Sequence, residues 1–251
     1  MDNKKEPELK MYYWPIMEPS FSKVIGYETC VKLVEKGLGS LPQNLFFPVA
    51  EKAGVGLSLG KWLFDEVCGC INKMEAKKIA FEYISMDLLA GQLRKKSIAA
   101  DLLKIAEESQ CAPGKICLEV HENFFGAKSD AIVERIYELK KAGFKIAIDN
   151  YSASLLPLSR LDTIPVDIIK LAKSLTERIS ADQKAAENVT SIIKQAKKQN
   201  IEIIAEDIEK EEQKELLMTL ACEKMQGPIF GRLINSREML SPRIVKTVQK
   251  S

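Results

Sequence analysis

The regular alternation of two kinds of segment constrains the fold of this chain more than any other feature. From about residue 57 onward, amphipathic stretches alternate with short runs rich in β-branched and other apolar residues. Leu59, Leu63 and Val67 fall on one face at helical spacing, and the run 79–84 then predicts a strand. Such alternation predicts parallel strands covered by helices. The later β-rich runs are 116–120, 144–148, 166–171, 201–205 and a short one ending at Met225.

The first part of the chain departs from this pattern. Two β-rich runs, 11–17 and 24–31, are joined by a segment too short for a crossover helix, so they should form an antiparallel hairpin. One antiparallel pair followed by parallel units predicts a modified TIM (β/α)8 barrel, and 251 residues suffice for one such domain over 1–251. Residues 1–10 mix both signs of charge and are expected to be a flexible N-terminal segment.

The composition argues against several classes of function. The net charge is +2 with both signs interspersed, so nothing favours DNA binding or attachment to a membrane surface. No apolar run approaches the roughly 18 residues of a membrane span and no secretory signal is seen, so we expect a cytoplasmic protein. Six cysteines with a single histidine fit reduced thiols better than a zinc site. An anionic ligand would have to be held by a local site.

Polar residues recur where the predicted strands end. Barrels of this class carry their chemistry at the carboxyl ends of the strands, where the connecting loops converge. One such residue alone would as readily be a structural salt bridge, but recurrence on successive strands predicts a shared polar pocket. Carboxylates with amides and a lysine are the ligand chemistry of Mg²⁺ or Mn²⁺ and of a phosphate. The residues are Glu28, Glu119, Asp149, Asn150, Lys170, Glu206 and Gln226.

At these positions the sequence resembles the EAL domain, and the resemblance runs over nearly the whole chain. Gly26-Tyr-Glu-Thr-Cys-Val-Lys32 is similar to Gly-Tyr-Glu-Ala-Leu-x-Arg, the motif that names the family. Asp149-Asn-Tyr-Ser-Ala-Ser154 stands where the family has Asp-Asp-Phe-Gly-Thr-Gly, and Pro165-Val-Asp-Ile-Ile-Lys170 matches Pro-Val-Asp-x-Ile-Lys. Further similar segments are Tyr13-Trp-Pro-Ile16, Phe46-Phe-Pro-Val-Ala-Glu51, Ala205-Glu-Asp-Ile-Glu209 and Gln226-Gly-Pro-Ile-Phe-Gly-Arg232.

The resemblance implies hydrolysis of cyclic di-GMP to linear pGpG with two divalent cations, Mg²⁺ or Mn²⁺. Lys170 matches the lysine that orients the attacking water, and Glu206 and Gln226 match groups that support the metal site. Glu209 matches the glutamate that steadies the loop after Asp149. The metal ligands implied by position are Glu28, Glu119, Asp149 and Asn150. The ligand-binding residues implied in the same way are Trp14, Lys32 and Pro48.

Several positions depart from the family pattern. The metal-binding asparagine of the family's Asn-Leu-Ser segment aligns with Tyr83, and a phenol is a poor ligand for a hard cation. Asn150 replaces the second aspartate of the Asp-Asp pair. Ser152 and Ser154 replace two glycines, which makes positive φ angles costly in that loop. Further substitutions are Ala172 for an aspartate, Lys32 for an arginine and Trp14 for a glutamine.

These departures predict a degenerate EAL domain with weak or no activity and with weak or single-metal occupancy. It would act by binding cyclic di-GMP, a protein partner or both. The alternative is an active metal-dependent phosphodiesterase that tolerates Tyr83 and Asn150. His121 is expected to have a structural role. A homodimer is implied by the resemblance alone.

Overall fold

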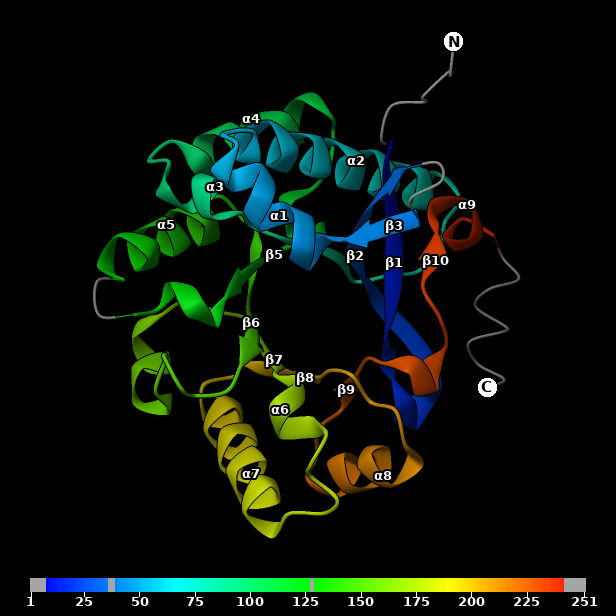
Figure 1. Ribbon diagram of the computed structural model, residues 1–251, viewed down its shortest axis with the longest axis vertical. Helices are drawn as coiled ribbons and strands as arrows, with labels where there is room; N and C mark the ends of the chain where they lie inside the picture. The colour runs from blue at the N-terminus through cyan, green and yellow to red at the C-terminus, as the bar shows by residue number, and fades with distance from the viewer. Residues whose placement is uncertain (1–7, 36–38, 127–128, 242–251) are drawn as a thin grey trace.

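The computed structural model describes residues 8–35, 39–126 and 129–241. Eight strands close into a barrel, because β1 pairs with β2 on one side and with β9 on the other. Helices lie outside this ring of strands (Figure 1). The predicted modified (β/α)8 barrel is confirmed. The barrel strands are β1 (Glu8–Glu18), β2 (Lys23–Glu35), β4 (Tyr83–Asp87), β5 (Ile116–His121), β6 (Lys145–Tyr151), β7 (Ile168–Leu171), β8 (Glu202–Ala205) and β9 (Lys224–Met225).

The first two strands form an antiparallel hairpin, as the sequence predicts. They pair from Glu8 opposite Val34 to Glu18 opposite Lys23, and the barrel pairings from β2–β4 to β8–β9 are parallel. β1 already begins at Glu8, which corrects the expectation that all of residues 1–10 form a flexible segment. Residues 1–7 lie outside the described ranges.

Helices cover the barrel from outside and connect most of the parallel strands. The long helix α2 buries Leu63, Phe64, Val67 and Ile71 beneath it. Between β6 and β7 the chain forms a 3-10 segment, Leu158–Thr163, in place of an α-helix. No helix within the described ranges is both long and apolar enough to cross a membrane. The helices are α1 (Gln43–Lys52), α2 (Gly56–Ala76), α3 (Ala90–Arg94), α4 (Ile98–Glu108), α5 (Asp130–Lys141), α6 (Lys173–Thr176), α7 (Gln183–Lys198), α8 (Glu211–Thr219) and α9 (Ser236–Met239), and the short strands β3 (Gly39–Pro42) and β10 (Ile234–Asn235) extend the sheet.

Strand β4 begins later than the sequence pattern predicts. It spans Tyr83–Asp87 and not residues 79–84. After α2 ends, Lys78 takes a left-handed conformation with φ 54, and the N–H of Ile79 donates to the carbonyl of Met74 at 3.0 Å. Ile79 and Phe81 pack against the core from a connecting segment. A β-rich run of apolar residues does not distinguish such a segment from a strand.

One layer of buried side chains fills the interior of the barrel. Side chains two residues apart on a strand point to the same side. The residues two positions after Cys117, Ala147, Ile168 and Ile204 therefore also face inward, one level nearer the carboxyl ends. These next residues are Glu119, Asp149, Lys170 and Glu206. The buried layer consists of Ile16, Ile25, Tyr83, Cys117, Ala147, Ile168 and Ile204.

Candidate functional site

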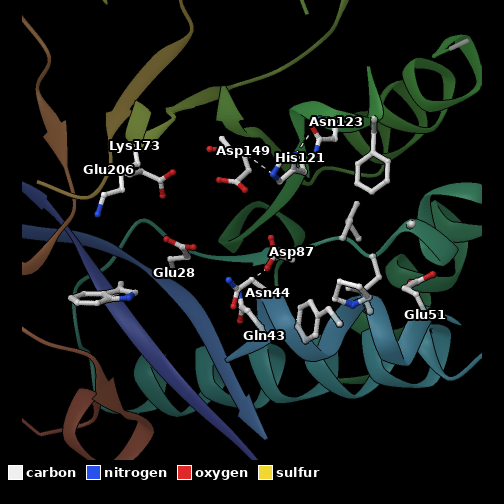
Figure 2. Close-up of a pocket in the computed structure, with 18 of the residues that line it drawn as sticks. Glu28, Gln43, Asn44, Glu51, Asp87, His121, Asn123, Asp149, Lys173 and Glu206 are labelled. Carbon is white, nitrogen blue, oxygen red and sulfur yellow. Dashed lines mark hydrogen bonds between the residues drawn. The ribbon is translucent and has the colours of Figure 1, made fainter. Parts of the chain in front are cut away.

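A cavity of about 1010 Å³ opens at the carboxyl ends of the barrel strands. This volume is at the upper end of the roughly 300–1,000 Å³ typical of ligand pockets. Four carboxylates that line the cavity reach into a common space from different strands or from the residue after a strand (Figure 2). They are Glu28, Asp87, Asp149 and Glu206. Apolar side chains also line it, so the cavity has both acidic and apolar walls. The apolar residues include Phe47, Pro48, Leu88, Leu89, Phe124 and Pro228.

Three carboxylates are close enough to share one cation. Oxygen atoms of Asp87, Glu119 and Asp149 all lie within 4.8 Å of one another. The strand register brings them together, because Asp87 pairs with Glu119 and Glu119 pairs with Ala147, two residues before Asp149. Carboxylate oxygens in this arrangement suit a hard divalent cation such as Mg²⁺ or Mn²⁺.

Lys170 lies buried beneath these carboxylates. Its Nζ is 2.8 Å from Glu206, 2.9 Å from Glu119, 3.0 Å from Glu28 and 3.7 Å from Asp149. Burial would lower the pKa of Lys170, but the surrounding carboxylates outweigh burial and raise it well above its ordinary value. The side chain is therefore an ammonium ion, which supplies one fixed positive charge to the cluster.

The carboxylates of the cluster are too crowded to ionise freely. Burial, assisted by the charges of Asp149 and Glu28, raises the pKa of Asp87 to about 7. Burial likewise raises the pKa of Glu119 and of Glu206 well above the ordinary value. The buried Oε1 of Glu119 lies 2.9 Å from the Nζ of Lys170. A divalent cation between the oxygens of Asp87, Glu119 and Asp149 would offset this repulsion, so the residues present fit a metal.

Asp87, and not Tyr83, is the β4 residue that lies beside the other carboxylates. Tyr83 is fully buried at the start of the strand, in the interior layer, whereas Asp87 ends the strand beside Glu119. Tyr83, which the resemblance aligns with the family's asparagine, does not line the cavity. The signal that sequence reasoning missed is Asp87-Leu88, which fits the family's Asn-Leu pair. The site has a carboxylate here where the family has an amide.

Asn150 is engaged by His121. The side-chain amide of Asn150 lies 3.2 Å from Nε2 of His121, and Nδ1 of His121 accepts a hydrogen bond from the backbone N–H of Asn123 at 3.1 Å. The atom of Asn150 that faces Nε2 is the amide nitrogen Nδ2, and this contact ties the Asn150 side chain to His121. Asn150 has φ 52, in the left-handed region that asparagine tolerates. His121 thus holds the neutral side chain of Asn150 at the wall of the cavity.

Glu122 holds the loop that follows Asp149. Its Oε2 accepts from the backbone N–H and the hydroxyl of Ser152 at 2.9 and 2.7 Å. Its Oε1 accepts from the backbone N–H groups of Leu155 and Leu156, both at 3.1 Å. Burial would raise the pKa of Glu122, but these hydrogen bonds outweigh burial and lower it. The ionised Glu122 carboxylate therefore fixes the loop, although sequence reasoning did not single it out.

The two serines of this loop do not cause the backbone strain that the sequence suggests. The left-handed residues in the loop are Asn150 and Ala153, with φ 52 and 62, and not Ser152 or Ser154. The hydroxyls of Ser152 and Ser154 lie 2.8 Å apart, and that of Ser152 donates to Glu122. The serines thus add hydrogen bonds to the loop.

Two predicted site residues lie outside the cavity wall. The Nζ of Lys32 lies 5.3 Å from the ring centre of Tyr12, and Lys32 does not line the cavity. Glu209 pairs with Lys173 at 2.9 Å, whereas Glu122 accepts the hydrogen bonds from the loop after Asp149. Sequence reasoning placed both residues by motif alone, without knowing where their long side chains point.

Trp14 and Pro48 do line the cavity, as a ligand-binding role requires. Ala172 is buried and does not line it. Among the polar groups on the cavity wall that sequence reasoning missed are the guanidinium of Arg94, which lies 3.3 Å from Glu51, and Gln43 of α1. Neither residue belongs to a strand end, so the search for polar strand ends could not find them.

Comparisons with known proteins identify one family and a shared fold. A family model described as the EAL domain matches residues 2–232. EAL domains depend on divalent metals.

Among curated proteins, the chain is 24% identical over 232 residues to the oxygen sensor protein DosP of Escherichia coli, covering 92% of this chain and 29% of that protein. It is 25% identical over 234 residues to the bifunctional diguanylate cyclase/cyclic di-GMP phosphodiesterase MucR of Pseudomonas aeruginosa, covering 93% of this chain and 34% of MucR. The chain thus spans about a third or less of the length of these relatives.

Solved structures share the fold. A MucR phosphodiesterase in complex with cyclic di-GMP superposes with a TM-score of 0.85 at 24% identity, covering 92% of this chain and 94% of that one. The FimX EAL domain from Pseudomonas aeruginosa, bound to cyclic di-GMP, superposes with a TM-score of 0.78 at 15% identity, covering 90% of each chain.

Proposed function

This chain belongs to the EAL domain family, and from that premise we propose that it binds cyclic di-GMP together with one divalent cation and hydrolyses the ligand slowly. It is related to phosphodiesterases of cyclic di-GMP signalling. The observation that carries the proposal is the contrast between two parts of one site. The cluster of Asp87, Glu119 and Asp149 is complete, whereas Asn150 is neutral and bonded to His121.

The chain's own residues supply most of what a phosphodiesterase site needs. Asp87, Glu119 and Asp149 would hold a cation, with Glu28 beside them. A bound cation lowers the pKa of water and neutralises phosphate charge. The Lys170 ammonium, held by four carboxylates, would orient a water against the phosphate. The apolar wall that includes Phe47 and Pro48 can bury a guanine base.

Slow turnover follows from the second cation position. The family places an aspartate where Asn150 stands, so the charge that would hold a second cation is missing at this point. We expect hydrolysis to be at least about a hundredfold slower than in an active relative, which corresponds to about 2.7 kcal/mol of transition-state stabilisation. The binding role, to cyclic di-GMP and through it to a protein partner, would then be the main one.

A fully active phosphodiesterase is the second candidate, and the charge of the site favours it. Asp87 adds a carboxylate that the family lacks, and Asn150 removes one that the family has. With all groups ionised, Glu28, Asp87, Glu119, Asp149 and Glu206 with the ammonium of Lys170 leave a net charge of −4. That charge equals the charge of two divalent cations. If Asp87 compensates for Asn150, two cations would bind.

The decisive experiment is to incubate the purified protein with cyclic di-GMP and Mn²⁺ and to follow pGpG by chromatography. Calorimetry with cyclic di-GMP and Ca²⁺, another hard cation that oxygen ligands bind, measures affinity in a separate titration. We expect measurable binding, quenching of Trp14 fluorescence by a stacked base and slow pGpG formation. Turnover of about 1 s⁻¹, the lower end of the usual range for enzymes, would establish the fully active phosphodiesterase. The absence of both binding and turnover would overturn both candidates.

Trp62 is the matched control for the fluorescence measurement. It lies on α2, outside the residues that line the cavity, so its emission should not respond to cyclic di-GMP. Trp14→Phe should therefore abolish the quenching, and Trp62→Phe should preserve it. Quenching that survives in Trp14→Phe would place the ligand elsewhere.

A further inference from the structure

Gln43, the first residue of α1, links three elements of the fold beside the carboxylate cluster. Its Oε1 accepts a hydrogen bond from the backbone N–H of Val31 in β2 at 2.6 Å. Its Nε2 donates to Oδ2 of Asp87, the last residue of β4, at 2.8 Å. Figure 2 shows Gln43 reaching Asp87 from the helix below the carboxylates.

The chemistry of the partners fixes the orientation of this amide. A backbone N–H can only donate, so the Gln43 atom that faces Val31 must be the oxygen. The NH₂ group is then left facing Asp87, where a carboxylate oxygen can accept from it. Among the described residues, Gln43 is the only hydrogen-bond donor to the carboxylate of Asp87. One Asp87 oxygen is therefore committed to the protein, and the other remains for a cation.

From this geometry we propose that Gln43 is a positioning residue that presents Asp87 to the cation as a one-oxygen ligand. The proposal rests on the cation site of the proposed function. It also explains why a carboxylate suits position 87 in this chain. An amide there has a single oxygen, and if that oxygen accepted from Gln43, the cation would face a nitrogen that cannot bind it. Gln43 and Asp87 thus form a matched pair.

A purely structural role is the competing explanation, because the same amide ties α1 to the barrel. Gln43→Glu separates the two roles, since a carboxylate of the same length still accepts from Val31 but no longer donates to Asp87. Gln43→Met removes the donor without adding charge. A partner that orients a metal ligand is typically worth about 10–100-fold in metal affinity. We therefore expect each variant to bind Mn²⁺ at least about tenfold more weakly.

The experiment measures Mn²⁺ affinity from the electron paramagnetic resonance signal of free Mn²⁺, with no nucleotide present. Gln183→Glu is the matched control, because Gln183 is also the first residue of a helix, is exposed on α7, and gains the same charge far from the cavity. It should bind Mn²⁺ as the parent does. In the Asp87→Asn background, Gln43→Met should have little further effect, because the pair is already broken.

The outcomes separate this proposal from the proposed function. If the parent binds Mn²⁺ and Gln43→Glu and Gln43→Met bind it equally well, the positioning role is overturned and the cation site stands. A loss of the same size in the parent and in the Asp87→Asn background would assign Gln43 to the fold alone. If the parent itself binds no Mn²⁺, the cation site and the positioning role both fail. Thermal unfolding in EDTA checks that each variant is folded.

Discussion

Replacing Asp87 by asparagine should stabilise the metal-free protein at alkaline pH. The pKa of Asp87 is raised from 3.8 to about 7, chiefly by burial and then by Asp149 and Glu28. At about 1.36 kcal/mol per pKa unit, ionising this group in the folded protein costs about 4 kcal/mol more than in the unfolded chain. Because neighbouring carboxylates share protons with Asp87, we expect the variant to recover about 2–4 kcal/mol.

The gain should depend on pH in a direction set by the raised pKa. In the parent, the folded state keeps the Asp87 proton at pH values where the unfolded chain has lost it. The stability of the parent therefore falls as pH rises from about 4 to about 7 and then levels off. The variant cannot ionise at this position and escapes that fall. Its advantage should be close to zero at about pH 4 and complete by about pH 8.

Urea unfolding in EDTA at pH 5 and pH 8, followed by circular dichroism, measures this difference. Asp162→Asn, at an exposed aspartate of the segment Leu158–Thr163, is the control and should show no such gain. Saturating Mn²⁺ should reverse the order, because the cation stabilises the parent more than the variant. The reasoning is refuted if the advantage at pH 8 is no larger than at pH 5, or if the control gains as much.

Four further changes test other parts of the site. Asn150→Asp should raise the affinity for a second Mn²⁺ in calorimetry and increase pGpG formation at least about tenfold, and no gain in either would remove Asn150 as the cause of slow turnover. Tyr83→Asn should lower the free energy of unfolding in urea by about 3–5 kcal/mol, as for other large buried side chains, and should not change the affinity for Mn²⁺. Tighter Mn²⁺ binding would contradict the position of Tyr83 below the site. Ala153→Gly should stabilise the protein by about 0.5–1 kcal/mol and raise Tm by about 2 °C, because it relieves a left-handed alanine. Glu122→Gln should raise hydrogen exchange at Leu155 and Leu156, and unchanged protection there would show that the loop has another support.

Sequence reasoning succeeded where a polar residue ends a regular strand. Glu119, Asp149 and Lys170 follow apolar runs, so the two-residue period of a strand fixes the side of the sheet to which they point. Asp87 escaped the same reasoning because its strand begins after a left-handed turn at Lys78. Lysine gives no signal for such a turn, unlike glycine or asparagine, and the apolar residues that follow imitate a strand.

Contacts between distant segments could not be predicted in this way. Gln43 and Asp87 lie 44 residues apart, and their hydrogen bond depends on how α1 sits against β2 and β4. The placement of Lys32 over Tyr12 depends on the rotamer of a long, half-buried side chain, which a motif does not encode. Helical and strand periods describe which face a residue occupies, but not which neighbour from another element it meets.

The antiparallel first strand has a consequence for how the protein is made. β1 pairs with β2 at once but meets β9 and β10 only after some 200 further residues have left the ribosome. The hydrogen bond from Gln226 to Glu28 crosses this seam and joins residues 198 positions apart. Such long-range pairing forms slowly, because the entropy of closing the long intervening segment is lost before the new contacts stabilise the structure. During synthesis, the acidic cavity therefore forms last. A nascent chain released before Met225 would expose the edges of β1 and β8 and would have no complete site.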